Sequence, residues 1–155
     1  MKKIKSLLFL SVMLLSISCT MSAKSGESAA TKASEGAVVV LTKAEFLTKV
    51  FNYESNSTEW KYEGSKPCIV DFYADWCGPC KQIAPVLKDL AATYKDDIVV
   101  YKVDVDKEKE LASAFGIQSI PTLLFVPAKG KPQIVNGAMP KEAFVKQIDT
   151  FLLGK

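Results

Sequence analysis

The chain has 155 residues, 48% of them hydrophobic, which is enough for one core of ordinary size and favours a single domain. Histidine is absent, which excludes Cys-His and Ser-His catalytic pairs and most zinc sites, so catalysis must use thiols, carboxylates or lysines. The formal charge of +3 disappears once Lys2, Lys3 and Lys5 are set aside, and with no arginine and no separate basic stripe we expect no nucleic-acid partner.

The first 18 residues have the layout of a secretory signal peptide. Three early lysines precede an apolar run over residues 6–15, which is shorter than the about 20 apolar residues that a membrane-spanning helix needs. We therefore interpret residues 1–18 as a cleaved export signal that places the remaining chain outside the cytoplasm, in the bacterial periplasm. Paired cysteines are chemically meaningful in such a compartment.

Cys19 follows the small residues Ser16 and Ser18, and this arrangement resembles the lipid acceptor of a bacterial lipoprotein signal. Cys19 is therefore a candidate for lipidation and membrane attachment, although Ser16 stands where that pattern usually has leucine. The alternative is an incidental cysteine beside an ordinary cleaved leader. Residues 19–36 are rich in Ser, Ala, Gly, Thr and Lys without apolar periodicity, which predicts a flexible linker.

The remaining chain, residues 37–155, alternates short apolar runs with stretches of helical spacing. In chain order we expect a strand (37–41), a helix with a capping box formed by Thr42 and Glu45, a strand (68–73), a helix (77–94), a strand (98–103), a helix (107–115), two strands (122–126 and 133–136) and a helix (141–153). Helical crossovers give parallel strands, and the turn around Gly130 gives one antiparallel pair. The order βαβαβαββα thus predicts an α/β fold whose central mixed sheet is covered by helices on both faces.

Residues 55–67 form a polar stretch between the first helix and the second strand, and this stretch contains Trp60 and Tyr62. These aromatic side chains either pack an extra turn against the domain or contact a partner. Cys68 begins the next strand, where burial would make its thiol an inert small apolar group rather than a redox sensor.

Cys77 and Cys80 stand where a predicted strand runs into a helix. Unpaired N–H groups and the positive end of the helix dipole stabilise an anion there, so we expect the pKa of Cys77 to lie below that of a free thiol. The two intervening residues place the thiols about one turn apart, where a disulfide can form. Gly78 leaves the approach to Cys77 open, and Pro79 stiffens the turn.

Two other roles for this cysteine pair stay open. A metal site would need further ligands, which the chain does not supply as histidines. A purely structural disulfide is the second alternative, although the exposed position that we expect for Cys77 at a helix start suits exchange better than cross-linking.

Several short stretches of residues 37–155 fall in one characteristic order and spacing. They are Asp71 to Lys81, Ile83-Ala84-Pro85, Lys102-Val103-Asp104, Phe115-Gly116-Ile117, Ile120-Pro121-Thr122 and Gly137-Ala138. Together these stretches resemble the thioredoxin family. The resemblance implies the thioredoxin fold, a monomer without cofactor or metal, and an enzyme that acts on disulfide-containing protein substrates.

The resemblance also implies a role for each central residue. Cys77 would be the attacking thiolate and Cys80 the resolving thiol, and the two would form the redox-active disulfide. Asp71 would accept the proton of Cys80, and Lys102 would lie near Asp71 and tune its pKa. A lone acid in the apolar strand over 68–73 should by itself have a raised pKa through desolvation, unless the carboxylate tilts out to solvent.

Pro121 resembles the cis-proline of the family, and the backbone of Ile120 before it would bind an extended substrate peptide. The implied site is a shallow apolar groove around Cys77, framed by Trp76, Gly78, Pro79, Ile120, Gly137 and Ala138. Ordinary packing is the alternative role for these residues.

The pair Gly78-Pro79 between the cysteines is that of the reducing thioredoxins, whereas oxidants and isomerases of this fold carry a histidine there. We therefore expect an exported protein-disulfide reductase. Because the chain has no nicotinamide- or flavin-binding motif, its electrons would come from a thiol-shuttling membrane protein. Two alternatives stay open: an exported oxidant that introduces disulfides, which shares every catalytic residue, and a non-catalytic adaptor that binds partners through the groove.

Overall fold

The computed structural model describes residues 36–155. The predicted signal peptide over 1–18, the candidate lipid acceptor Cys19 and all but the last residue of the predicted linker over 19–36 lie outside the described residues. Within the described part of the chain, no helix is both long enough and apolar enough to cross a membrane.

Strands and helices follow one another in the predicted order. They are β1 (Val39–Val40), α1 (Lys43–Lys49), β2 (Cys68–Tyr73), α2 (Gly78–Thr93), β3 (Val99–Asp104), α3 (Lys109–Ala114), β4 (Thr122–Val126), β5 (Gln133–Asn136), α4 (Lys141–Gln147) and a π-helical turn, η1 (Ile148–Leu152), that continues α4. The bounds predicted for β2, β4 and β5 are confirmed. β1 is shorter than predicted because only Val39 and Val40 pair with β3.

The strands form one mixed sheet in the order β1-β3-β2-β4-β5. β1, β3 and β2 are parallel, but β4 runs antiparallel to both β2 and β5, so the expectation of a single antiparallel pair is wrong. The helix between β3 and β4 has only 6 residues. It rises about 9 Å, less than the about 20 Å length of a strand, and the connection does not return the chain to the opposite edge of the sheet. The chain therefore enters β4 at the edge where β2 ends, and Thr122 pairs with Phe72.

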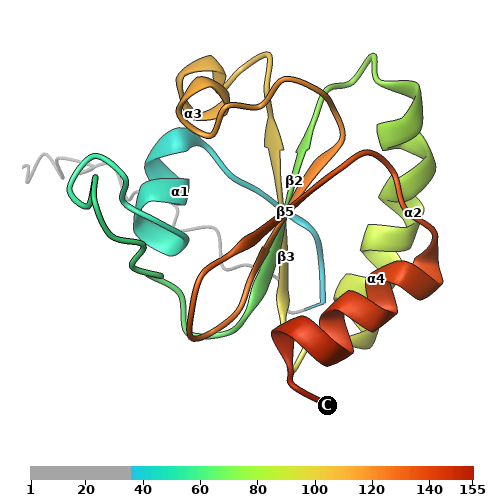
Figure 1. The fold of residues 1–155 in the computed structure, drawn as a ribbon. Helices are drawn as coiled ribbons and strands as arrows, with labels where there is room; N and C mark the ends of the chain where they lie inside the picture. The colour runs from blue at the N-terminus through green and yellow to red at the C-terminus, as the bar shows by residue number, and fades with distance from the viewer. Residues whose placement is uncertain (1–35) are drawn as a thin grey trace, which may run out of the picture. The chain divides into compact units, whose positions relative to one another are not determined.

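Helices cover both faces of the sheet, as predicted. Ile69 and Leu87 belong to the core beneath α2 and α4, whereas Phe46 and Phe72 belong to the core beneath α1 and α3. Figure 1 shows these two pairs of helices on opposite sides of the sheet. Because side chains alternate along a strand, Asp71 points to the same face as Ile69. The alternation of β2 thus places the carboxyl group of Asp71 under the helix that begins beside the cysteines.

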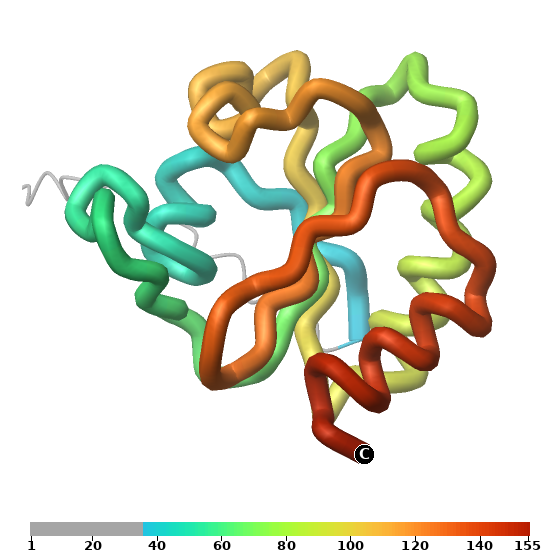
Figure 2. The backbone as a smooth tube through the Cα atoms, in the orientation of Figure 1, coloured from blue at the N-terminus to red at the C-terminus, as the bar shows by residue number. Residues whose placement is uncertain are grey.

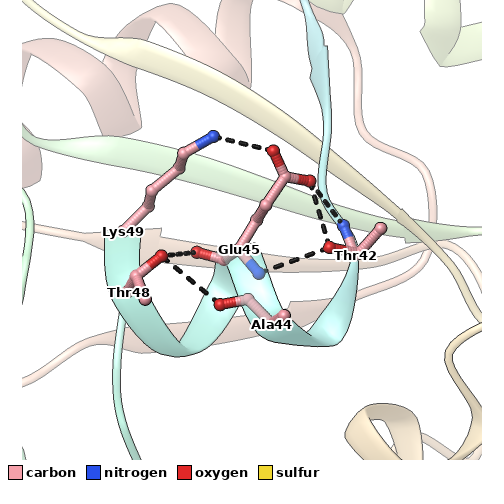
Figure 3. A network of polar contacts seen from close by, with 5 residues as sticks. All are labelled: Thr42, Ala44, Glu45, Thr48 and Lys49. Atoms are coloured by element: carbon pink, nitrogen blue, oxygen red, sulfur yellow. Dashed lines mark hydrogen bonds and ion pairs between the residues drawn. The ribbon is translucent and has the colours of Figure 1, made fainter. Parts of the chain in front are cut away.

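The predicted capping box at the start of α1 is confirmed (Figure 3). The backbone N–H of Glu45 donates to the hydroxyl of Thr42 over 3.3 Å, and the backbone N–H of Thr42 donates to the carboxylate of Glu45 over 3.1 Å. The same carboxylate pairs with Lys49 one turn later, at 2.9 Å. The two contacts between Thr42 and Glu45 satisfy backbone N–H groups that the start of a helix otherwise leaves unpaired.

The segment between α1 and β2 packs against the domain. Figure 2 shows it as a loop that doubles back beside α1. The backbone N–H of Glu63 donates to the carbonyl of Val50 over 3.0 Å, Tyr62 forms an isolated bridge with Phe51, and the ring of Trp60 lies 4.3 Å from that of Phe51. The structure therefore shows the packing role for Trp60 and Tyr62 that the sequence left as one of two possibilities.

Candidate active site

Cys77 and Cys80 form a disulfide at the start of α2, with their Cα atoms 5.3 Å apart. Cys77 is the N-cap residue, and its sulfur accepts the backbone N–H of Cys80 over 3.1 Å. That N–H belongs to the first helical turn, which has no carbonyl partner of its own, so it is available to stabilise negative charge on the sulfur.

The expectation that Cys77 would be exposed is wrong for this disulfide-bonded form. Cys77 is 3% exposed and Cys80 is 4% exposed, because Ala74 and the partly buried Ile120 pack around them. Gly78, the next residue, is exposed, and a Cβ atom added there would extend into open space. That Gly78 leaves the approach to Cys77 open stays a prediction.

Asp71 lies in the middle of β2 and is only 4% exposed, so the alternative of a solvent-facing carboxylate is wrong. One of its oxygens, Oδ1, is buried without a hydrogen-bond partner. Burial raises the pKa of Asp71 to about 7, while the positive charge of Lys102 acts in the opposite direction. Lys102 is its register partner on the adjacent strand β3. Asp71 is therefore a carboxyl group that can exchange a proton near neutral pH.

A cavity of about 180 Å³ joins Asp71 to Cys80. Its walls also include Tyr73, Ala84 and Lys102. A space of this size can hold several water molecules, and water can carry a proton between a thiol and a carboxylate. Two residues that the resemblance implied as partners are thus brought to one cavity from β2 and α2.

The indole of Trp76 stands at the surface next to the disulfide. It is 69% exposed, and its N–H donates to the carboxylate of Asp106 over 2.8 Å. A large exposed apolar side chain that is held in place by a hydrogen bond is suited to contact another molecule. Asp106 was missed in the sequence because it follows β3 and nothing in its neighbourhood marks it as the partner of a tryptophan.

A groove of about 360 Å³ lies between Trp76 and the loop before β4. Its lining residues are Trp76, Val105, Ile117, Gln118, Ser119 and Ile120. Only Trp76 and Ile120 were among the predicted groove residues. Residues 117–119 directly precede Ile120, so their position before the proline was the signal that could have included them.

The Ile120–Pro121 peptide bond is cis, the isomer that the resemblance implies. The backbone N–H of Gly137 donates to the carbonyl of Pro121 over 2.7 Å, which places Gly137 against the loop. Gly137 has a φ of 90°, a conformation that favours glycine. Ala138 follows it and is exposed, as are Gly78 and Pro79 at the start of α2, and none of these three lines the 360 Å³ groove.

Cys68, the remaining cysteine of the described residues, lies on β2 with no exposed surface. It belongs to the core beneath α1 and α3, on the face of the sheet opposite to Asp71. Burial raises the pKa of its thiol to about 12. Among residues 36–155, no group of three His, Cys, Asp or Glu side chains is placed to hold a metal ion.

Comparisons with known proteins agree with this geometry. The family model described as Thioredoxin matches residues 37–150. The chain is 46% identical over 113 residues to "Thioredoxin" of Borreliella burgdorferi, an alignment that covers 73% of this chain and 96% of the relative. It is 41% identical over 100 residues to "Thioredoxin M-type, chloroplastic" of Spinacia oleracea, covering 63% of this chain and 55% of the relative. Among solved structures, that of a mutant thioredoxin from Halobacterium salinarum is similar, with a TM-score of 0.60 and 30% identity, covering 77% of this chain and 95% of that one.

Proposed function

The chain belongs to the thioredoxin family, and from this premise we propose that it reduces disulfide bonds of proteins outside the cytoplasm. Members of the family are thiol–disulfide oxidoreductases, and this chain is one of them, acting on disulfide-containing protein substrates. The observation that carries the proposal is the Cys77–Cys80 pair at the start of α2 with the buried carboxyl group of Asp71 behind Cys80.

The first step uses the reduced protein. The Cys77 thiolate attacks one sulfur of the substrate disulfide, a bond forms between Cys77 and that sulfur, and the substrate disulfide breaks. The departing substrate sulfur leaves as a thiolate and takes a proton from solvent. The N–H of Cys80, 3.1 Å from the Cys77 sulfur, supports the thiolate before the attack.

In the second step Cys80 breaks the mixed disulfide. The Cys80 thiol gives its proton to Asp71 through their shared cavity, and the resulting thiolate attacks the sulfur of Cys77. The Cys77–Cys80 disulfide forms and the second substrate sulfur leaves as a thiolate, which takes up a proton. Two electrons have then passed from this protein to the substrate.

The substrate peptide would lie in the groove beside Trp76. Ile120, before the cis-proline, contributes to that groove and packs beside the disulfide. In the proposal, Trp76 and Ile120 hold the segment on both sides of the substrate cysteine. Holding the reacting sulfur atoms in line in this way raises the rate of exchange by removing the cost of orientation from the reacting step.

The sequence of residues 1–18 supports the location. Its basic start and short apolar run are those of an export signal, and Cys19 is the candidate for lipidation. A reductase in an oxidising compartment must be reduced again after each turnover. We assign that role to a thiol-shuttling membrane protein, because the sequence has no motif for a nicotinamide or flavin cofactor.

Reduction of insulin disulfides by the full chain, with dithiothreitol as the electron source, tests the activity. Cys77→Ser should abolish turnover and Cys68→Ala, on the opposite face of the sheet, should retain it. A substrate mixed disulfide should accumulate on Cys80→Ser. No turnover by the unaltered chain would support a non-catalytic adaptor in place of the reductase.

The equilibrium reduction potential of the Cys77–Cys80 pair tests the direction. A value of about −270 mV, which is known for a thioredoxin, would support the reductase. A value of about −120 mV, which is known for a strong periplasmic oxidant, would instead support disulfide formation.

The location is tested separately by cell fractionation and the mass of the mature N-terminus. If Cys19 carries the lipid, Cys19→Ser should move the protein from the membrane fraction to the soluble fraction. An unprocessed chain in the cytoplasm would contradict export.

A further inference from the structure

Lys102 lies beside Asp71 without pairing with it. The two residues are register partners on β2 and β3, yet no ion pair joins their side chains within 4.0 Å. The ammonium nitrogen of Lys102 lies instead over the ring of Tyr73, 4.8 Å from the ring centroid. Tyr73 is two residues after Asp71 on β2, so both side chains face the same side of the sheet.

We propose that Tyr73 is a positioning residue whose ring holds the Lys102 ammonium away from the Asp71 carboxylate, and thereby keeps Asp71 able to take a proton from Cys80. This proposal rests on the proposed function, in which Asp71 is the proton acceptor of Cys80. It assigns Tyr73 no contact with the substrate.

The physical basis is a competition for one cation. The face of an aromatic ring attracts an ammonium group electrostatically, and the attraction grows when the pair is partly shielded from water, as the half-buried Tyr73 and Lys102 are. A carboxylate attracts the same ammonium group more strongly, but an ion pair would stabilise the charged form of Asp71. It would lower the pKa of Asp71 and make it a weaker base for the thiol proton.

The cavity leaves room for a second position of the Lys102 ammonium group, next to the Asp71 carboxylate. Asp71, Tyr73 and Lys102 all line the 180 Å³ space that leads to Cys80, so the Lys102 side chain can move from the ring to the carboxylate without displacing the core. The other ionisable side chains around Asp71 are Asp75 and Lys81 in this cavity and Lys88 in a second cavity of about 380 Å³. Lys102 is the charge that lowers the pKa of Asp71. Burial is the larger influence on the pKa of Asp71, and Lys102 is the charge that opposes it, so the position of Lys102 modulates how readily Asp71 takes a proton.

The test is an NMR titration of the Asp71 carboxyl carbon in the oxidised full chain. Tyr73→Leu frees Lys102, so the acid dissociation constant of Asp71 should rise roughly tenfold, which is the effect of bringing an opposite charge into contact. Tyr73→Phe keeps the ring and should leave the titration unchanged. Tyr101→Leu, which removes a tyrosine from the opposite face of the sheet, is the matched control and should also leave it unchanged.

The double variant Tyr73→Leu with Lys102→Met separates the proposal from a general change in the cavity. Without Lys102, removing the ring should no longer raise the acid dissociation constant. An equal rise with and without Lys102 would mean that water entering the cavity causes the effect, and would overturn the proposal, as would an unchanged titration in Tyr73→Leu.

A second replacement keeps the test decisive where Tyr73→Leu fails to fold. Pentafluorophenylalanine at position 73 has nearly the shape of the native ring but an electron-poor face, so it should release Lys102 while preserving packing. It should raise the acid dissociation constant as leucine does, and an unchanged titration would overturn the proposal. Because the titration needs no turnover, its failure is distinct from a failure of insulin reduction, which tests the proposed function.

Discussion

Asp71 and Cys80 reach the same cavity from different elements, Asp71 from the middle of β2 and Cys80 from the first turn of α2. The carboxyl group is buried, and one of its oxygens has no hydrogen-bond partner. Such an arrangement disfavours the charged form of an acid and therefore costs stability whenever the acid is ionised. The position of Asp71 serves proton transfer at the expense of folding free energy.

The Asp71→Asn substitution should therefore stabilise the protein and slow it. Burial raises the pKa of Asp71 from 3.8 to about 7, so the folded protein holds this proton more tightly than the unfolded chain. The stabilising effect of the proton is fully present below pH 3.8 and is lost as the pH rises through about 7, a change of about 4 kcal/mol. Asparagine stays neutral, so the variant should gain stability over the native chain only as the pH rises through and above that range.

Urea unfolding across the pH range measures this difference. The two chains should have similar stability below pH 3.8, diverge between pH 3.8 and about 7, and differ by a constant amount above that, while insulin reduction by the variant near neutral pH falls at least about tenfold. Asp75→Asn, which removes an exposed carboxylate next to the motif, is the control for the loss of one negative charge. A constant stability gain at every pH would contradict the role of burial.

Replacing each of the two tryptophans by alanine should have opposite effects on stability and on activity. Trp60 packs on Phe51 with ring centroids 4.3 Å apart, so Trp60→Ala should cost about 3 kcal/mol of unfolding free energy and leave the catalytic efficiency of the remaining folded protein unchanged. Trp76 is 69% exposed, so Trp76→Ala should change stability by less than about 0.5 kcal/mol but lower kcat/KM for protein substrates roughly tenfold. Denaturation and insulin reduction on both variants provide the measurements. A loss of activity in folded Trp60→Ala would give the inserted loop a part in substrate binding.

The elements that the sequence predicted correctly are those whose signal is local. The apolar runs of β2 and β4 and the Thr42–Glu45 cap depend on neighbouring residues and were predicted at the right positions. The direction of β4 depends on how far the connection around α3 can reach, which is a property of its length in space. A rule that assigns a parallel crossover to every intervening helix therefore failed there.

At the candidate site, too, local sequence signals were predictive and contacts between separate segments were not. The cysteines, Asp71 and the residues around Pro121 were identified because they belong to short stretches that resemble the family. The Asp106 partner of Trp76 and the place of Lys102 over the ring of Tyr73 depend on side-chain positions between separate segments. The burial of Cys77 likewise follows from packing by Ala74 and Ile120, which the spacing of the motif does not determine.

The cap of α1 should contribute to stability independently of the site. Thr42→Ala removes the hydroxyl that accepts the N–H of Glu45, and should cost about 1 kcal/mol. Thr48→Ala is a matched control within the same helix, because its hydroxyl only donates to carbonyls of the preceding turn and should change stability by less than about 0.5 kcal/mol (Figure 3). Chemical denaturation measures both variants. Equal losses would mean that the hydroxyl at position 42 does not act as a cap.

Alkylation should distinguish the cysteine of the core from those of the site. Burial raises the pKa of Cys68 to about 12 and leaves its side chain with no exposed surface, so neither its thiolate form nor its sulfur is available to a reagent in the folded protein. After reduction of the full chain, iodoacetamide at mildly alkaline pH should modify Cys77, the N-cap residue of α2 next to the exposed Gly78, and should leave Cys68 unmodified. Adding guanidinium chloride should expose Cys68 and bring its modification to completion, which peptide mass spectrometry can follow site by site. Rapid modification of Cys68 without denaturant would show instead that the segment carrying Trp60 and Tyr62 opens readily, and that the packing beneath α1 is weaker than the contacts of these side chains indicate.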